Sequence, residues 1–103
     1  QALMWFMILA DDAPGNAALR TAQRPAHLAY LQALIDDHRL LLAGPRPLEP
    51  GKPLSETPII GSLIIADFDS LEAAQQWAAG DPYAKAGLFE QVRIEAFVKA
   101  LPA

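Results

Sequence analysis

Two apolar runs constrain the fold of this chain more than any other feature. The runs "MWFMILA" (residues 4–10) and "IIGSLIIADF" (residues 59–68) are apolar at nearly consecutive positions instead of alternate ones. Strands with this pattern are buried on both faces, so each run needs cover on two sides. The run at the start of the chain is too short to cross a bilayer, and no basic segment precedes it. We therefore expect two inner strands of a cytoplasmic protein.

Residues 22–38 have the spacing of an amphipathic helix. Apolar side chains recur there at intervals of three and four, and we place the centre of the buried stripe at Leu28, Leu31 and Ile35. Pro25 is expected in the first turn of this helix, where its missing N–H is harmless.

The remaining segments complete the order of elements. Residues 39–44 predict a short strand, and residues 91–99 predict another because apolar and polar side chains alternate there. Residues 70–80 predict a second helix, with an N-cap at Asp69 or Ser70 and a terminal glycine as its stop. The proline-rich segment 45–58 is expected to form an exposed loop, and residues 81–90 a turn or short helical piece.

The order strand, helix, strand, strand, helix, strand is that of the split βαβ or ferredoxin-like plait. This α+β fold is an antiparallel four-stranded sheet with two helices on one face. The length of 103 residues fits a single domain, residues 1–103. Because two helices cover only one face, we expect the other face to pack against a second copy, as a homodimer. Apolar residues of the two inner strands that support this expectation include Trp5, Phe6, Met7, Ile60, Leu63 and Ile65.

Charge and composition exclude several classes of function. The chain has 8 basic and 12 acidic residues, a net charge of -4, and the basic residues are scattered, so we exclude nucleic acid as a partner. It has no cysteine, no phosphate-binding or dinucleotide motif and no serine nucleophile elbow. His27 and His38 are roughly 16 Å apart along the predicted helix, too far to share a metal ion. We expect neither a metal nor a cofactor.

His27 lies at the edge of the predicted apolar stripe and has two interpretations. It is either a half-buried histidine that bonds to a backbone carbonyl, or a general acid or base at the mouth of a pocket. Asp81 precedes Pro82 and is therefore biased to extended backbone. It either caps the next turn or, if the two helices lie side by side, accepts a hydrogen bond from His27 and holds its tautomer. The second arrangement would be a dyad for proton transfer.

Four further residues are candidates for substrate binding. Asp12 lies in the loop before the first helix and is alternatively a solvated turn residue. Arg24 would suit an anionic substrate or a surface salt bridge. Ser62 lies in a buried strand, so its hydroxyl must either bond to the backbone or point into a pocket. Tyr83 belongs to an apolar set expected to form the pocket walls, together with Trp5, Met7, Leu42, Leu63 and Phe89.

Several segments together resemble the YciI-like (YCII-related) family of small bacterial proteins. They are "RPAHLAYL", "AGP" at residues 43–45 and "GSLIIADFDSLEAAQQWAAGDPYAKAGLFEQV", in that order. The resemblance implies a ferredoxin-like plait of the dimeric α/β-barrel superfamily. It also implies an active site around a histidine and an aspartate, which match His27 and Asp81. The aspartate of the family's D-x-P-G turn matches Asp12, and its glycine-serine pair matches Gly61 and Ser62.

Two functions remain as hypotheses at this point. Enzymatic members of the family act in aromatic breakdown, including a dehydrochlorination, so the resemblance favours an enzyme. Its His27–Asp81 dyad would perform cofactor-independent acid–base chemistry, of a lyase or isomerase type, on a small aromatic or enolisable substrate. The alternative is a non-catalytic module that binds a small ligand or a protein. A His27 ring with one nitrogen free in an open pocket would favour the enzyme.

Overall fold

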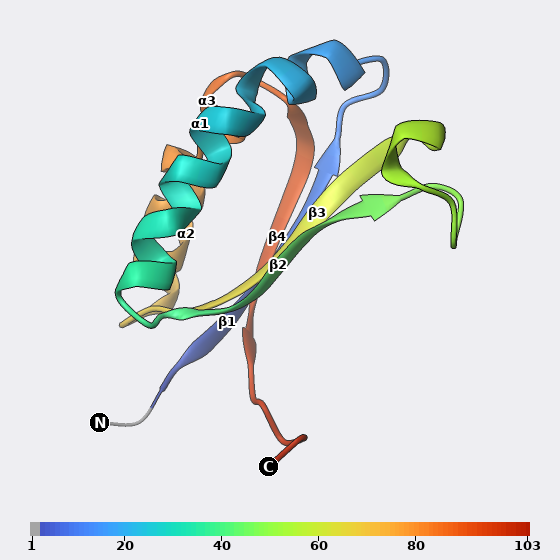
Figure 1. Ribbon diagram of the computed structural model, residues 1–103. Coiled ribbons are helices and arrows are strands. Elements are labelled where there is room, and N and C mark those ends of the chain that lie inside the picture. Colours follow the sequence, from blue (N-terminus) through green and yellow to red (C-terminus); the bar gives the residue numbers. More distant parts are fainter. Residues whose placement is uncertain (1–2) are drawn as a thin grey trace.

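The computed structural model describes residues 3–103 (Figure 1). The chain forms four strands, two long helices, one short helix and a single 3-10 turn within these residues. Their bounds are β1 (Trp5–Asp12), α1 (Ala17–Asp36), β2 (Leu40–Pro47), η1 (Leu54–Glu56), β3 (Ile59–Asp67), α2 (Leu71–Gly80), α3 (Pro82–Lys85) and β4 (Phe89–Phe97).

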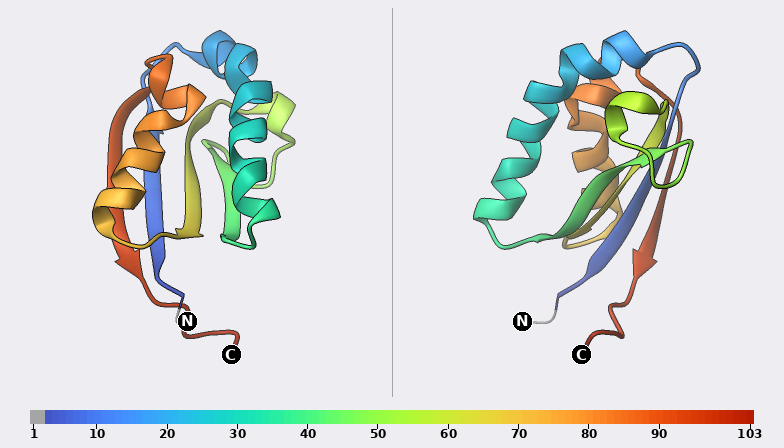
Figure 2. Two further views of the ribbon diagram at one scale, coloured as in Figure 1. Left: turned by 90° about the vertical axis from the view of Figure 1, so that its left-hand side faces the viewer. Right: turned by 45° about the vertical axis from the view of Figure 1, so that its right-hand side comes forward.

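The strands form one antiparallel sheet in the order β2-β3-β1-β4, with the two apolar strands β1 and β3 in the centre. All the helices lie on the same face of this sheet (Figure 2). This arrangement confirms the predicted α+β, ferredoxin-like plait. No helix in residues 3–103 is long and apolar enough to cross a membrane.

The core lies between the sheet and the helices. In β1, Phe6, Ile8 and Ala10 are buried, whereas the residues between them are half-buried. Directly opposite residues share a face, so Ile64 and Ala66 of β3 join them through the pairs Ile8–Ile64 and Phe6–Ala66. Burial of each large side chain stabilises the fold by about 1.5–3 kcal/mol. The helices contribute Leu31, Leu34, Ala74 and Ala78 to this core.

The buried stripe of α1 differs from the predicted one. His27, Leu31 and Leu34 are buried, whereas Leu28 and Ile35 are 46% and 48% exposed. The observed buried stripe therefore begins at His27, one residue before the predicted stripe, and continues four residues later at Leu31 and three residues after that at Leu34. His27 therefore lies at the centre of the buried face of the helix. The sequence pattern placed it at the edge because that pattern counted only apolar residues.

Helix α1 also begins earlier than predicted, at Ala17, so Pro25 is inside the helix and not in its first turn. An interior proline removes one backbone hydrogen bond and bends the helix. Figure 1 shows this bend as α1 curves over the sheet. Packing on both sides of Pro25 offsets the cost, since Arg20 before it and His27 after it are both anchored.

Strand β2 is longer than predicted and ends at Pro47. It is an edge strand of the sheet, where the missing N–H groups of Pro45 and Pro47 are tolerated. The loop before β3 is correspondingly shorter and contains the turn η1.

The face of the sheet away from the helices carries the other side chains of the inner strands. The register places Trp5, Met7 and Leu63 there, together with Ile65. Two of the predicted residues lie elsewhere: Phe6 faces the helices because side chains alternate along β1, and Ile60 is 41% exposed.

Candidate functional site

His27 and Asp81 are in direct contact. Nδ1 of His27 lies 2.8 Å from Oδ1 and 3.1 Å from Oδ2 of Asp81, and the two residues are only 8% and 2% exposed. No hydrogen bond to Nε2 of His27 is found in the part of the chain that the structure describes. An ionised carboxylate only accepts hydrogen bonds, so Nδ1 is the protonated nitrogen and Nε2 of the neutral ring is the free base.

The junction between α2 and α3 positions Asp81. The extended backbone expected before Pro82 is observed, with φ −59° and ψ 129°. Oδ1 of Asp81 also accepts a hydrogen bond from the Tyr83 backbone N–H at 2.9 Å, so the residue caps α3. Both sequence interpretations of Asp81 therefore hold at once. The cap fixes the carboxylate, and α1 brings His27 to it.

Tyr83 lies parallel to the His27 ring. Their ring centroids are 4.0 Å apart with an interplanar angle of 15°, and the Arg20 guanidinium lies 4.6 Å from the Tyr83 centroid. Burial raises the pKa of Tyr83, and the positive charges of Arg20 and Arg24 offset this rise only in part. The phenol is therefore neutral at ordinary pH.

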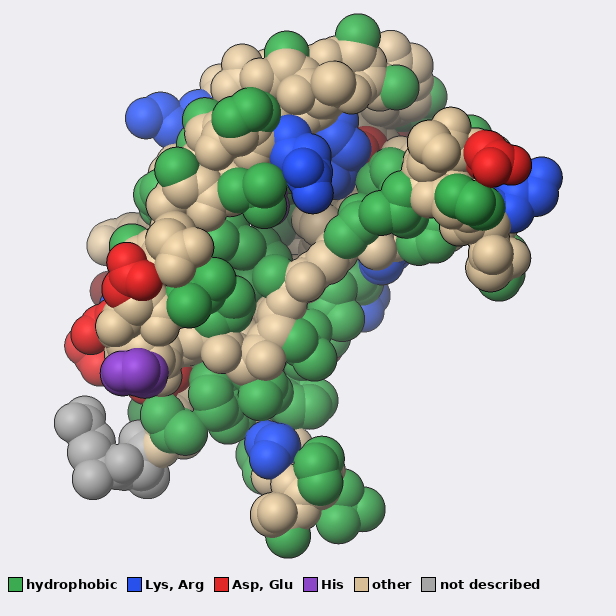
Figure 3. All heavy atoms as spheres, in the orientation of Figure 1, with side chains coloured by type: hydrophobic (Ala, Val, Ile, Leu, Met, Phe, Trp, Pro, Cys, Tyr) green, Lys and Arg blue, Asp and Glu red, His purple; other side chains and the backbone are tan. Residues whose placement is uncertain are grey.

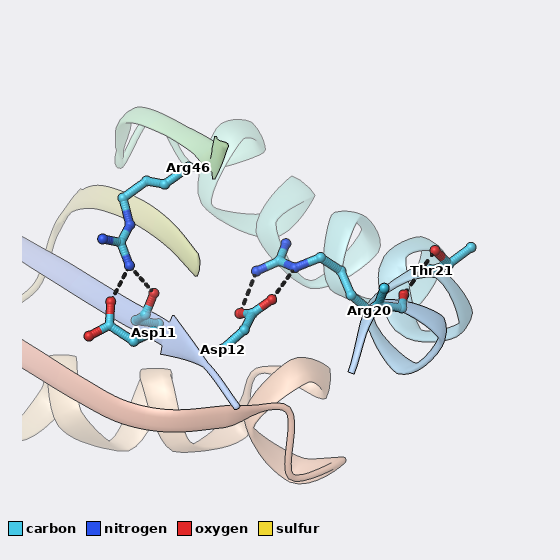
Figure 4. Close-up of polar contacts among 7 residues, drawn as sticks. Asp11, Asp12, Arg20, Thr21 and Arg46 are labelled. Atoms are coloured by element: carbon cyan, nitrogen blue, oxygen red, sulfur yellow. Dashed lines mark hydrogen bonds and ion pairs between the residues drawn. The ribbon is translucent and has the colours of Figure 1, made fainter. Parts of the chain in front are cut away.

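Asp12 binds a residue that the sequence analysis did not single out. Arg20 donates from Nε and from Nη2 to the two carboxylate oxygens of Asp12, at 2.7 and 2.9 Å (Figure 4). Burial lowers the pKa of Arg20, but the hydrogen bonds and charges of Asp12 and Tyr83 together outweigh it, and the pKa is raised overall. Arg20 stands one helical turn before Arg24 and two before His27, and this spacing is the signal that could have identified it.

A pocket opens beside the dyad, between α1 and strands β2 and β3. Its volume is about 170 Å³. Basic side chains gather at the hollow between α1 and β2 (Figure 3). Arg20 and Arg24 line the pocket. The full lining is Arg20, Arg24, His27, Leu28, Leu31, Ala43, Gly44, Pro45, Ser62, Ile64 and Tyr83.

Of the apolar walls predicted for this pocket, Tyr83 alone lines it. Trp5, Met7 and Leu63 lie on the opposite face of the sheet, a consequence of side-chain alternation. Leu42 is paired with Ile65, which also places it on that face. Phe89 lies behind the site and packs edge-on against Tyr83, with centroids 6.0 Å apart.

Ser62 contributes a buried hydroxyl. The residue is 4% exposed, and its Oγ has no hydrogen-bond partner among residues 3–103. Its direct cross-strand neighbours are Ala10 and Pro45, neither of which has a polar side chain. A backbone partner, one of the two expectations for this hydroxyl, is not found within residues 3–103, and Ser62 is among the residues that line the pocket.

Other features of the molecule lie away from the dyad. A larger hollow of about 360 Å³ is bordered by Met4, Asp37, Arg39 and Asp67, at the opposite end of the sheet. Within residues 3–103, no three side chains of His, Cys, Asp or Glu gather closely enough to hold a metal ion.

The fold and the amino-acid sequence define the class of this protein. The YCII-related domain matches residues 4–98, and the chain belongs to that family. It is 46% identical over 96 residues to the protein YciI of Escherichia coli O6:H1, covering 93% of this chain and 98% of the relative. The resemblance inferred from the sequence is thereby confirmed.

Two other similar proteins have names that indicate chemistry. The 5-chloro-2-hydroxyhydroquinone dehydrochlorinase of Burkholderia phenoliruptrix AC1100, solved in complex with 2,5-dihydroxybenzoquinone, has 30% identity and a TM-score of 0.82. The match covers 92% of this chain and 94% of that one. The derivative of benzaldehyde biosynthesis cluster protein C of Emericella nidulans is 35% identical over 95 residues, 85% of this chain and 91% of the relative.

Proposed function

We propose that this protein is an enzyme that transfers a proton to or from a small aromatic or enolisable substrate, without a cofactor. The observation that carries the proposal is the His27–Asp81 pair, in which Nδ1 is bonded and Nε2 is left free beside a pocket. A free imidazole nitrogen on an oriented ring is the usual arrangement of a general base.

Each residue of the pair has a defined role in this proposal. Asp81 positions the ring and stabilises the imidazolium that forms when Nε2 takes up a proton. His27 then returns this proton to a leaving group or to another atom of the substrate. Tyr83 supports the ring from one side, so that the ring keeps its orientation beside the pocket.

The similarity to a dehydrochlorinase supports a lyase type of step. In a dehydrochlorination, Nε2 removes a proton, and the electrons of the bond to that hydrogen shift to form a new double bond. Chloride leaves with the electron pair of the carbon–chlorine bond. In an isomerisation, the same proton returns at a different position. Both reactions require only an acid–base group and a pocket that holds one ring.

The matched substitutions His27→Asn and His38→Asn test the proposal, since the chain has only these two histidines. His38 has φ 58°, a conformation that asparagine tolerates, and it lies at the far end of α1. With 5-chloro-2-hydroxyhydroquinone as trial substrate and chloride release as readout, we expect His27→Asn to lose at least about 100-fold in kcat, the lower range for general-base catalysis. His38→Asn should keep full activity.

Asp81→Asn should also reduce kcat. The NH₂ group of the asparagine amide cannot accept a hydrogen bond from Nδ1–H of His27, and the amide carbonyl oxygen is a weaker acceptor than a carboxylate oxygen. Full activity in a folded His27→Asn variant would refute the catalytic role. If the protein binds single-ring compounds but turns over none of them, the non-catalytic module is the correct function.

We also propose that two copies pair through the face of the sheet that carries Trp5, Met7 and Leu63. These residues form an apolar surface that no helix covers in residues 3–103. Sedimentation should give the mass of a dimer at micromolar concentration. A folded monomer at that concentration would contradict the pairing, and Met7→Lys should produce such a monomer.

A further inference from the structure

We infer that the pocket beside His27 selects a small anion, which Arg24 attracts and the Ser62 hydroxyl binds. The inference rests on the proposed function only in that it uses the same pocket, and it specifies the charge of the ligand. Three features support it: the balance of charges around the pocket, an unpaired buried hydroxyl, and the size of the cavity.

One cation in the lining of the pocket has no counter-ion. Arg20 is neutralised by Asp12 through two hydrogen bonds, whereas Asp81 keeps its negative charge behind the neutral His27 ring and does not line the pocket. Arg24 lines the pocket and makes no ion pair within residues 3–103. No acidic side chain lines the pocket. An anion placed there therefore meets one positive charge and no nearby repulsion from the lining.

Ser62 supplies the second feature, on the opposite wall from α1. Its Oγ is buried and lacks a partner in the described residues, and its cross-strand neighbours Ala10 and Pro45 have no polar side chain. A buried hydroxyl without a partner destabilises a fold, so a serine at such a position carries a cost in stability. A hydroxyl has one proton to donate, and a carboxylate or enolate oxygen is the strongest acceptor it can meet.

The volume of the pocket suits a ligand with one ring. Its volume of about 170 Å³ is close to the ~150 Å³ of a protein cavity that admits benzene. Leu31, Ile64 and the ring of Tyr83 provide apolar walls. The ligand class is therefore a single-ring anion, that is, an aromatic carboxylate, phenolate or cyclic enolate. Its charged oxygen lies toward Arg24 and Ser62.

The test compares benzoate with benzamide, which have the same shape but differ in charge. Binding to the full chain is followed by NMR titration at pH 7, with the His27 ring and the Ser62 amide as reporters of the pocket. We expect benzoate to bind at least about tenfold more tightly than benzamide, the effect of one hydrogen bond to a charged group. Added salt should weaken benzoate and leave benzamide unchanged.

Two variants and one control identify the groups that recognise the anion. Arg24→Gln should remove most of the preference for benzoate, whereas Lys99→Gln, which removes the same charge from the C-terminal segment, should leave it intact. Ser62→Ala should weaken benzoate binding without lowering stability, because it deletes an unpaired hydroxyl. A purely structural serine would show the opposite result.

Equal affinity for benzoate and benzamide would overturn the inference. An unchanged preference for benzoate in Arg24→Gln would also overturn it. The same holds if the NMR signals of the His27 ring do not shift with either compound at about 10 mM, a concentration well above the largest dissociation constant expected for such a contact. The binding test involves no turnover, so it is independent of the proposed catalysis. If benzoate binds and His27→Asn retains full activity, the anion pocket stands while the proposed enzyme mechanism falls.

Discussion

The hydroxyl of Tyr30 occupies the space where any residue other than glycine at position 80 would place its Cβ. A Cβ on Gly80 would lie 2.5 Å from the Tyr30 Oη, which in turn donates a hydrogen bond to the Trp77 carbonyl at 2.8 Å. Gly80 is the last residue of α2, and Asp81 follows directly. This contact between α1 and α2 therefore sets the position from which Asp81 reaches His27.

We predict that Gly80→Ala is destabilising, although alanine is the better helix former by about 1 kcal/mol. The new methyl group must displace Tyr30, with an expected loss of about 1–3 kcal/mol, as for overpacking in general. Urea unfolding measures this loss. Activity should fall as well, because the shift is transmitted to Asp81.

A Tyr30→Phe substitution in the same chain provides the control. It removes the oxygen at 2.5 Å and leaves the next atom, Cζ, at 3.3 Å from the added Cβ. The double variant Tyr30→Phe/Gly80→Ala should therefore be more stable than Gly80→Ala alone. If the two effects simply add, the contact does not couple the helices, and this explanation is wrong.

Two glycines of the sheet, Gly61 and Gly44, are predicted to respond differently to substitution by alanine. A Cβ at Gly61 would overlap the Ala10 carbonyl oxygen and the Arg46 guanidinium, which donates to that oxygen and to Asp11 (Figure 4). The Ala10 oxygen is backbone in a central strand and cannot move aside. Gly61→Ala should therefore cost about 3 kcal/mol or more in the free energy of unfolding.

Gly44 is the matched control for Gly61. It lies in the neighbouring strand β2, and nothing is found within 4 Å of a Cβ added there. Gly44→Ala should leave urea unfolding nearly unchanged. Equal losses for the two alanine variants would show that the close approach of Arg46 and Ala10 is not the source of the cost at Gly61.

The sequence predicted the fold well because the fold depends on patterns that are visible along the chain. The consecutive apolar residues of β1 and β3 require the central positions of the sheet, and the alternation in β4 suits an edge strand. The start of α1 was missed because Pro25 was assigned to a first turn. Tertiary contacts before that residue, above all Arg20 with Asp12, outweigh the cost of an interior proline.

The candidate site was predictable only in part. The contact between His27 and Asp81 followed from two helices side by side, which the order of elements implies. The pocket walls did not follow, since a strand buried on both faces gives no clue to which face a given side chain takes. Trp5 and Met7 were therefore placed on the wrong side, and a charged residue such as Arg20 was overlooked in favour of apolar ones.

The two tyrosines of the chain predict how stability depends on alkaline pH. Burial, and to a lesser degree the charge of Asp81, raise the pKa of Tyr30, and burial raises that of Tyr83 against the opposing charges of Arg20 and Arg24. The ordinary value is 10.0, which applies to the unfolded chain. The unfolded chain therefore releases these phenolic protons at lower pH than the folded protein does.

This difference makes the folded protein less stable at alkaline pH. The stabilisation is fully present below pH 10, and it is lost as the pH rises from there through the higher pKa values of the folded state. In this window Tyr83 lowers the free energy of unfolding by at most about 1.4 kcal/mol per pH unit. Tyr83→Phe, which keeps the stack on His27, should flatten the decline. Phenolate absorbance in the folded protein should rise only above pH 10, and a midpoint at or below that value would contradict the assigned burial of both rings.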